Sequence, residues 1–333
     1  MRVRPHVLAI AIAASVPLIG CDSVPTDRVL RVPDGPRFAS SANFSDWSQP
    51  VSLGPLVNSA NSEQQPTVTK DGLTLYFTSG RPLEGHPAGD LNIFVSHRAC
   101  TDIDDADCAW EAPVALGPEI NTEYLDATPA LSRDEHYLFF ASQRPRDNCA
   151  PEPPAVCDRD LYVSYREDVH DDLAWQAPVN LGPAINTAAE DLAPAYFDGA
   201  GGAPQLFFTR GLVAAADLYV STMQPDGSWG TATGITELNT NGNAEARPSL
   251  TNDGLLMYFW STRTTAARIF TTTRENTGAS WSAPQLVPPP IDGASTQQPF
   301  IYSHGNTESL YFIRTTTTGG LDMFVSERSR GSH

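Results

Sequence analysis

Short stretches rich in apolar and aromatic residues recur along the chain, separated by turn-forming residues. Each unit begins with a Trp, and a Pro follows eighteen or nineteen residues later. The five tryptophans are Trp47, Trp110, Trp175, Trp229 and Trp281, and the five prolines are Pro66, Pro129, Pro194, Pro248 and Pro299. A fixed period built only from short strands and turns is typical of a β-propeller.

Four strand-like segments are predicted in each unit. In the first complete unit they cover 64–69, 73–79, 92–97 and 110–116. The second segment is rich in Tyr and Phe, as expected of a buried pleated surface, and an Asp-Gly-like turn before it favours a tight hairpin. The pattern therefore predicts an all-β fold, a single five-bladed β-propeller of four-stranded blades.

The pattern Pro-x-x-(Ser/Thr)-x-Asp-Gly-x-x-Leu-Tyr-Phe-x-Ser-x-Arg, followed by Asp-Leu-Tyr-Val-Ser, resembles the WD40-like repeat of TolB-type β-propellers. The resemblance covers nearly everything from Trp47 to Arg328, and it implies blades that run from an inner to an outer strand. Because the chain begins with a Trp segment and stops after a third strand, residues 47–53 are expected to supply the outer strand of the last blade. TolB has six blades and a further N-terminal domain, so the resemblance does not imply a role in the Tol–Pal system.

The N-terminus predicts export. Arg2 and Arg4 precede an apolar run over 7–20 that closes on Cys21. The Leu-Ile-Gly-Cys ending resembles the bacterial lipobox, which implies lipid attached to Cys21; an ordinary signal with an unrelated Cys is the alternative. The predicted organisation is a lipoprotein signal peptide at 1–20, a flexible tether at 21–43 and the propeller at 44–333. The protein is expected to be lipid-anchored in the bacterial cell envelope, facing the periplasm or in the outer membrane.

The chain is strongly acidic. Its formal net charge is −18, and Lys70 is its only lysine. This composition argues against nucleic acid as a partner and against electrostatic docking on anionic lipid, because both need a basic cluster.

Four cysteines besides Cys21 form two local pairs with the same spacing. They are Cys100, Cys108, Cys149 and Cys157. An even number in an exported protein predicts disulfides, and three pairings are open. The local pairing, Cys100 with Cys108 and Cys149 with Cys157, is favoured because each closes a short loop. Free thiols and metal ligation are the alternatives, although the seven intervening residues and the lack of a nearby His disfavour a zinc site.

An Arg follows the second segment of every unit, and four units offer an Asp before or within the third segment. The expected intra-blade pairs are Arg81 with Asp90, Arg144 with Asp160, Arg210 with Asp217, and Arg314 with Asp322. Repetition in every blade favours a structural role for them, and an anion-binding cluster of arginines is the alternative.

An acid stands three residues before the Pro in four units. These residues are Glu63, Asp126, Asp191 and Glu245. They lie where the chain reaches each innermost strand, so together they could form a ring at one mouth of the central channel as a ligand or partner face. Capping of the local loop is the structural alternative. No cofactor or metal site is expected. If the four carboxylates converge, Ca²⁺ is the ion that they could bind.

No motif for a nucleophile, a zinc protease or a phosphate-binding loop is present. The main expectation is therefore a non-catalytic propeller that acts as a protein-interaction scaffold for an envelope partner. The alternative is a carbohydrate-binding, glycosidase-like or sialidase-like propeller that uses the channel-mouth carboxylates, since glycosidases need two carboxylates across a pocket.

Overall fold

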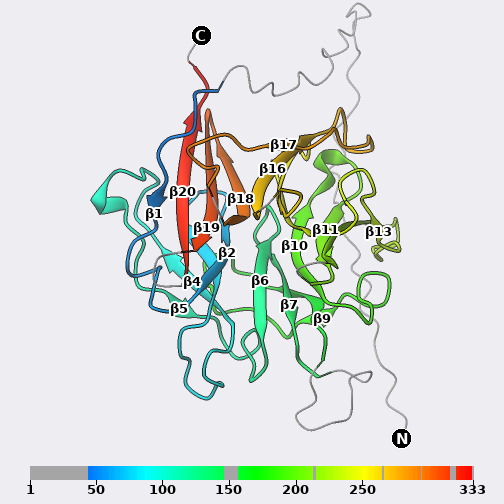
Figure 1. The fold of residues 1–333 in the computed structure, drawn as a ribbon. Helices are drawn as coiled ribbons and strands as arrows, with labels where there is room; N and C mark the ends of the chain where they lie inside the picture. Colours follow the sequence, from blue (N-terminus) through cyan, green and yellow to red (C-terminus); the bar gives the residue numbers. More distant parts are fainter. Residues whose placement is uncertain are drawn as a thin grey trace, which may run out of the picture.

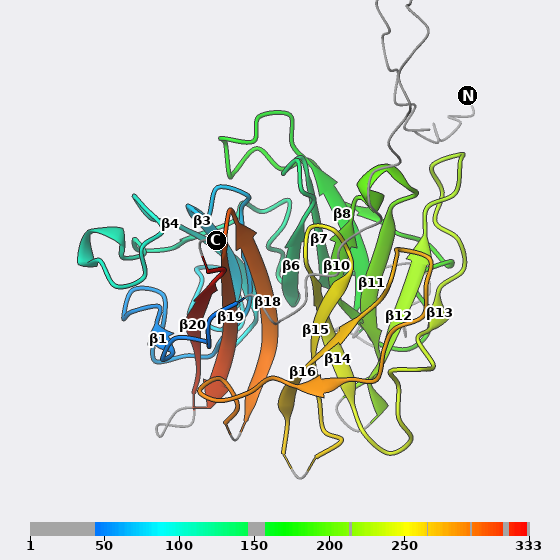
Figure 2. The ribbon, with the colours of Figure 1, turned by 90° about the horizontal axis from the view of Figure 1, so that it is seen from above.

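The computed structural model describes residues 44–145, 157–212, 215–264, 266–293, 295–315 and 320–331. Five four-stranded antiparallel sheets stand around a common axis, as the two views in Figures 1 and 2 show. The expected fold class, a five-bladed β-propeller, is confirmed. The predicted signal peptide, Cys21 and the tether lie outside the described residues and stay predictions. Within the described ranges, no helix has the length and apolar character needed to cross a membrane.

Each blade is a meander whose first strand is nearest the axis. The first blade consists of β2 (Glu63–Val68), β3 (Thr74–Ser79), β4 (Asn92–His97) and β5 (Val114–Ala115). The second consists of β6 (Asp126–Leu131), β7 (Tyr137–Ser142), β8 (Asp160–Tyr165) and β9 (Val179–Asn180). The third consists of β10 (Asp191–Phe197), β11 (Gln205–Arg210), β12 (Asp217–Thr222) and β13 (Thr233–Gly234). The fourth consists of β14 (Glu245–Leu250), β15 (Leu256–Ser261), β16 (Arg268–Thr273) and β17 (Gln285–Leu286). The fifth consists of β18 (Thr296–His304), β19 (Thr307–Thr315), β20 (Leu321–Ser329) and β1 (Val51–Ser52). Two short 3₁₀ turns, η2 (Ala106–Cys108) and η3 (Gly199–Gly201), lie in the connections.

The ring is closed by β1, the outer strand of the last blade. Val51 pairs with Val325 in β20, and the Leu53 amide donates to the Met323 carbonyl at 3.1 Å. Figure 1 shows β1 and β20 side by side although they come from opposite ends of the chain. The expected closure by residues 47–53 is confirmed, and it leaves no unpaired seam between the first and last blades.

The hydrophobic core lies between neighbouring blades. One cluster joins Tyr76 and Ile93 of the first blade to Leu138 and Phe140 of the second, and all four are buried. Comparable clusters fill the remaining junctions. Burial of apolar area between sheets therefore stabilises the ring as a whole, because a single blade has no partner for its faces.

Every innermost strand contains a β-bulge just before its Pro. The bulge residues have φ between 52° and 61°, in the left-handed region; they are Gln65, Thr128, Ala193, Arg247 and Gln298. The register of each inner strand shifts at this point. Pro has no amide hydrogen for the ladder, and a bulge on an edge strand accommodates it.

The order of the strands defines two faces of the disc. The leading face carries the loops before each inner strand and those between the second and third strands. The hairpin face carries the turns between the first two strands and the loops between the third and fourth. The Cys100–Cys108 disulfide, between β4 and β5, is confirmed and belongs to the hairpin face. Cys157 is also disulfide-bonded, and Cys149, its expected partner, lies outside the described residues.

Candidate functional site

The four acids expected at the channel mouth are buried within their own blades. Each is 0% exposed: Glu63, Asp126, Asp191 and Glu245. In the second blade, Asp126 accepts hydrogen bonds from the amide and hydroxyl of Thr122 at 2.7 Å and from Nη2 of Arg144 at 2.9 Å. The other three acids repeat this arrangement. The structure therefore places these carboxylates in loop-capping positions and does not gather them around an accessible opening.

The same acids are the partners of the repeated arginines. The observed pairs are Arg81 with Glu63, Arg144 with Asp126, Arg210 with Asp191, and Arg263 with Glu245. The predicted pairing of these arginines with Asp90, Asp160, Asp217 and Asp322 is therefore wrong. The reason is the path of the side chain, which lies across the aromatic rings of the second and third strands and ends at the fully desolvated carboxylate of the inner strand. In the fifth blade Thr296 replaces the acid, and Arg314 donates to the carbonyls of Pro290 and Ile291.

The expected Asp partners have other surroundings. Asp217 and Asp322 lie opposite Arg210 and Arg314 in the strand ladders without forming an ion pair among the described residues. Asp160 accepts from the side-chain amide of Asn180 at 2.9 Å, and Asp90 lies 3.7 Å from His86.

A second set of arginines, which the sequence patterns did not single out, connects the blades. Its members stand two residues after a Ser or Thr of the third strand: Arg98, Arg166, Arg274 and Arg328. Arg166 is fully buried, donates to the hydroxyl of Tyr76 in the neighbouring blade at 2.9 Å and stacks on Trp175. Met223 takes this position in the third blade. The recurring Ser-x-Arg spacing was the signal that could have revealed these residues.

The accessible space at the axis begins at the bulge residues. A cavity of about 90 Å³ is lined by the five bulge residues, the five prolines and the residues just after them. It adjoins a second cavity of about 120 Å³ toward the hairpin face, and both share the walls formed by Thr67, Leu131, Tyr196, Leu250 and Phe300. None of the described residues that line the first cavity is acidic. The channel is thus open on the hairpin side of the bulges, while the four buried acids precede them in the chain.

Side chains from neighbouring blades hold the bulges together. The backbone amide of Gln65 donates to Oε1 of Gln298 at 3.0 Å, and the backbone amide of Ala193 donates to Oγ1 of Thr128 at 3.2 Å. The Arg247 amide donates to Oγ1 of Thr209 at 2.8 Å. These contacts fix the strained backbone, because a left-handed conformation of a residue other than Gly persists only when its surroundings determine it.

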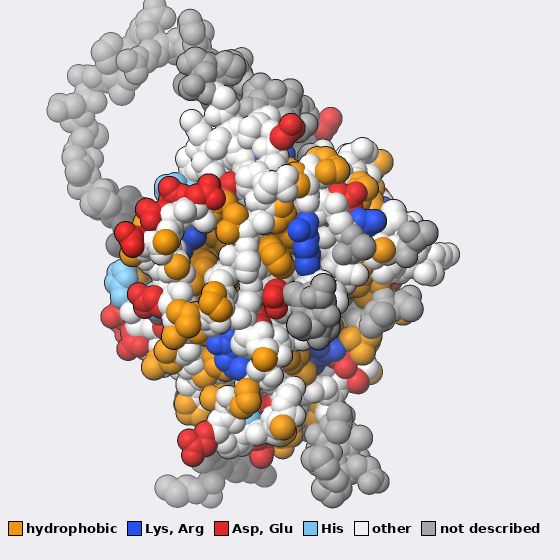
Figure 3. Space-filling view, turned by 60° about the vertical axis from the view of Figure 1, so that its left-hand side comes forward, with side chains coloured by type: hydrophobic (Ala, Val, Ile, Leu, Met, Phe, Trp, Pro, Cys, Tyr) orange, Lys and Arg blue, Asp and Glu red, His pale blue; other side chains and the backbone are white. Residues whose placement is uncertain are grey.

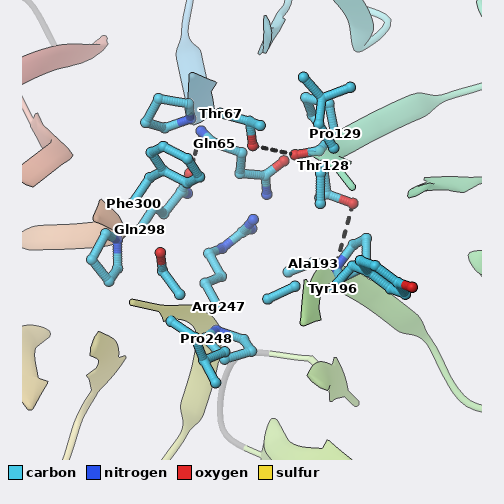
Figure 4. A pocket seen from close by; sticks show the side chains of 18 residues that line it. Gln65, Thr67, Thr128, Pro129, Ala193, Tyr196, Arg247, Pro248, Gln298 and Phe300 are labelled. Carbon is cyan, nitrogen blue, oxygen red and sulfur yellow. Dashed lines mark hydrogen bonds between the residues drawn. The ribbon is translucent and has the colours of Figure 1, made fainter. Parts of the chain in front are cut away.

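The side chain of Arg247 is different from the other bulge residues, because it carries a charge into the cavity. Figure 4 shows its guanidinium in the middle of the channel, with Gln65, Thr128 and Gln298 around it. Within the described residues the guanidinium forms no ion pair, and its buried Nη1 atom has no hydrogen-bond partner. Burial, together with repulsion from Arg159, lowers the pKa of Arg247 to about 9. A partly buried guanidinium without a counter-ion among the described residues is a group that can pair with an anion.

A larger groove of about 710 Å³ lies between the fourth and fifth blades. Its floor includes Trp47, Tyr258 and Arg328. Arg328 stacks on Trp47 and donates to both Glu308 and Tyr258. The principal polar groups of the groove are therefore already paired with one another.

Acidic side chains are more numerous than basic ones over the whole chain, and Figure 3 shows a group of them along one margin of the face it displays. Within the described residues, no group of three or more His, Cys, Asp or Glu side chains is arranged to hold a metal ion. The carboxylates proposed to converge on Ca²⁺ are instead engaged by the arginines of their own blades.

Known proteins share the fold at low sequence identity. A structure described as a glycoside hydrolase is 10% identical over 84% of this chain and 91% of its own, with a TM-score of 0.62. The catalytic domain of the Coprinopsis cinerea GH62 α-L-arabinofuranosidase is 12% identical over 86% and 96%, with a TM-score of 0.57. The endo-arabinase from Bacteroides thetaiotaomicron is 11% identical over 86% and 98%, with a TM-score of 0.53. At this identity the likeness establishes the fold.

These comparisons bear on two expectations drawn from the sequence. TolB from Acinetobacter baumannii is among the similar structures, at 14% identity and with a TM-score of 0.41. The propeller fold is shown by the strand order, and the TolB-type resemblance stays an expectation from the sequence. Several of the similar structures are glycoside hydrolases, which contradicts the expectation of a non-catalytic protein-interaction scaffold. No protein-family model and no curated protein matches the chain.

Proposed function

We propose that this protein is a carbohydrate-active propeller that binds the end of a glycan in its axial channel. The observation that carries the proposal is the set of polar side chains in an open cavity at the axis: Gln65, Thr128, Arg247 and Gln298. Amide, hydroxyl and guanidinium groups are suited to bind sugar hydroxyls, and a few such groups in a largely apolar pocket give a ligand its orientation. The fold shared with arabinofuranosidases and an endo-arabinase supports a saccharide as the ligand.

The size of the channel favours end-on binding. The two adjoining cavities of about 90 and 120 Å³ each hold a few water molecules. A terminal sugar can enter such a space from the hairpin face, whereas a chain segment laid across the disc cannot. Phe300 and Tyr196, which line both cavities, supply apolar surface for the carbon face of the sugar.

The proposal places the ligand at the bulge residues and assigns no catalytic role to the four buried acids. Glycoside hydrolysis needs two carboxylates that reach the scissile bond. Glu63, Asp126, Asp191 and Glu245 are each 0% exposed and capped by loop residues. Binding is therefore the activity that the channel supports.

A glycan array probed with the full-length protein, followed by calorimetric titration of the bound glycans, tests the proposal. The double variant Gln65→Ala/Gln298→Ala is expected to weaken binding about tenfold or more through loss of hydrogen bonds to the sugar. Gln285→Ala, at an exposed site in the larger groove and outside both axial cavities, is the control and should bind normally. Absence of binding to every glycan, or binding that the double variant leaves unchanged, would contradict the proposal. Hydrolysis of arabinofuranosides that persists in the double variant would contradict it as well.

A further inference from the structure

The channel carries a charge pattern opposite to that of the whole molecule. The chain has 39 acidic and 21 basic residues, yet basic residues line both axial cavities. Arg247 lies in the first cavity, and Lys70 and Arg133 line the second, which opens toward the hairpin face. Glu135 is the acidic residue there, and its carboxylate accepts the backbone amide of Lys70 at 2.8 Å. The axis is thus a basic site within an acidic protein, a distribution that directs an anion to the channel.

Arg247 occupies a position where no other blade has a charge. The equivalent bulge residues are Gln65, Thr128, Ala193 and Gln298. A feature required by the fold is expected to recur from blade to blade, as the buried Arg–acid pairs do in four of the five blades, whereas this cation occurs once. Its backbone amide satisfies the structural need of the bulge by donating to Thr209, and among the described residues the buried Nη1 atom of the guanidinium has no hydrogen-bond partner. The side chain is therefore available to a ligand.

We infer that the channel selects acidic saccharides, with the carboxylate of a terminal uronic acid paired to the guanidinium of Arg247. The inference rests on the proposed function, because it names the class of sugar that the same site takes. A guanidinium presents two parallel N–H groups that match the two oxygens of a carboxylate. The buried Nη1 atom of Arg247 then gains the acceptor that it lacks in the free protein. The side-chain oxygens of Gln65 and Gln298 already accept hydrogen bonds from the Thr78 hydroxyl and the Gln65 backbone amide. Side-chain N–H groups of both glutamines remain for the neighbouring hydroxyls of the sugar.

The test compares matched ligands on the full-length protein by calorimetric titration. An oligosaccharide that ends in glucuronic acid is measured beside the same oligosaccharide ending in glucose and beside the methyl ester of the glucuronate. A sulfated oligosaccharide forms a fourth arm. The acidic ligand is expected to bind about tenfold to hundredfold more tightly than the neutral ones, since hydrogen bonds to charged groups exceed neutral ones by that factor. The preference should fall as salt is raised.

Arg247→Gln is the decisive variant. Its folding is expected to be intact, because the wild-type guanidinium makes no ion pair among the described residues, and thermal unfolding checks this. The preference for the acidic ligand should fall to about onefold in this variant. Arg330→Gln, an exposed arginine at the larger groove, is the control and should keep the preference.

The outcomes separate the inference from the proposed function. Equal binding of acidic and neutral saccharides by the wild type overturns the inference and leaves the proposed function standing. A preference that survives Arg247→Gln, or a preference for the sulfated ligand, also overturns the assignment of a carboxylate to Arg247. Absence of binding to any saccharide overturns the proposed function itself.

Discussion

Nε of Arg210 lies 2.7 Å from Oδ1 of Asp191, its partner in the β10–β11 ladder, whereas Asp217, its partner in the β11–β12 ladder, forms no ion pair with it. Of its two cross-strand neighbours, the guanidinium thus pairs with the fully buried acid at the start of the inner strand. Asp191 also accepts the Thr187 amide at 2.8 Å. One carboxylate therefore fixes both the loop before the inner strand and the arginine at the end of the second strand.

This choice of partner predicts unequal effects of two matched substitutions. Asp191→Asn should lower the free energy of unfolding by about 3–5 kcal/mol, because it leaves the Arg210 cation without its buried counter-charge. Asp217→Asn should change it by less than about 0.5 kcal/mol. Urea unfolding measures both. Equal losses of unfolding free energy in the two variants would show that Arg210 depends on Asp217 as well.

The connection between blades at Arg166 predicts another large effect. Arg166→Met should destabilise the protein by about 3–5 kcal/mol, because Asp172 and the hydroxyl of Tyr76 lose a buried charged partner. Met223 occupies the equivalent position in the third blade, and Met223→Leu is the matched control, with a cost below about 1.5 kcal/mol. Unfolding in urea, followed by Trp fluorescence, compares the two. A loss of less than about 1 kcal/mol for Arg166→Met, on the order of a single hydrogen bond, would refute this role of Arg166.

Closure of the ring predicts a local effect at Asn58. Its side chain accepts the Met323 amide at 2.8 Å and donates to the Met323 carbonyl at 2.9 Å. Asn58→Ala should cost about 1–3 kcal/mol and should speed hydrogen exchange in β1 and β20. Asn239→Ala removes the same pair of hydrogen bonds from Leu218, away from the closure. It should cost a similar amount without faster exchange in β1, and faster exchange there in both variants would argue against a local role.

Buried carboxyls predict how stability changes with pH. Burial raises the pKa of Glu327, with hydrogen bonding from Ser309 acting in the opposite direction. A raised pKa means that the folded state holds the proton more tightly than the unfolded state does. The stabilising contribution of the protonated Glu327 carboxyl to the free energy of unfolding is fully present below the unfolded pKa of about 4.5. It is lost as the pH rises through the pKa of the folded state.

Glu327→Gln mimics the protonated side chain and tests this sign. The variant should exceed the wild type in stability at about pH 8, and the difference should shrink as the pH falls toward about 4.5. Thermal unfolding across this pH range measures the difference, with Glu111→Gln, at an exposed site, as the control. A difference that grows on acidification would reverse the assigned sign.

Local patterns along the chain were enough to predict the fold. Trp–Pro spacing and the aromatic second strands indicated five blades, and the position of Trp47 indicated the closure, because strand periodicity and turn chemistry are local properties of the chain. The pairing of Cys100 with Cys108 was also local. The tryptophans and the inner-strand prolines could be placed in their blades before any contact was known.

Which polar groups meet depends instead on how the blades are arranged in space. Arg210 could reach Asp191 or Asp217, and its choice depends on where the chain around the inner strand leaves a desolvated carboxylate. Arg247 is one arginine among many in the sequence, and its position before Pro248 became informative only when the bulge turned it toward the axis. Its lack of a partner depends on side chains from all five blades, whose convergence no local pattern encodes.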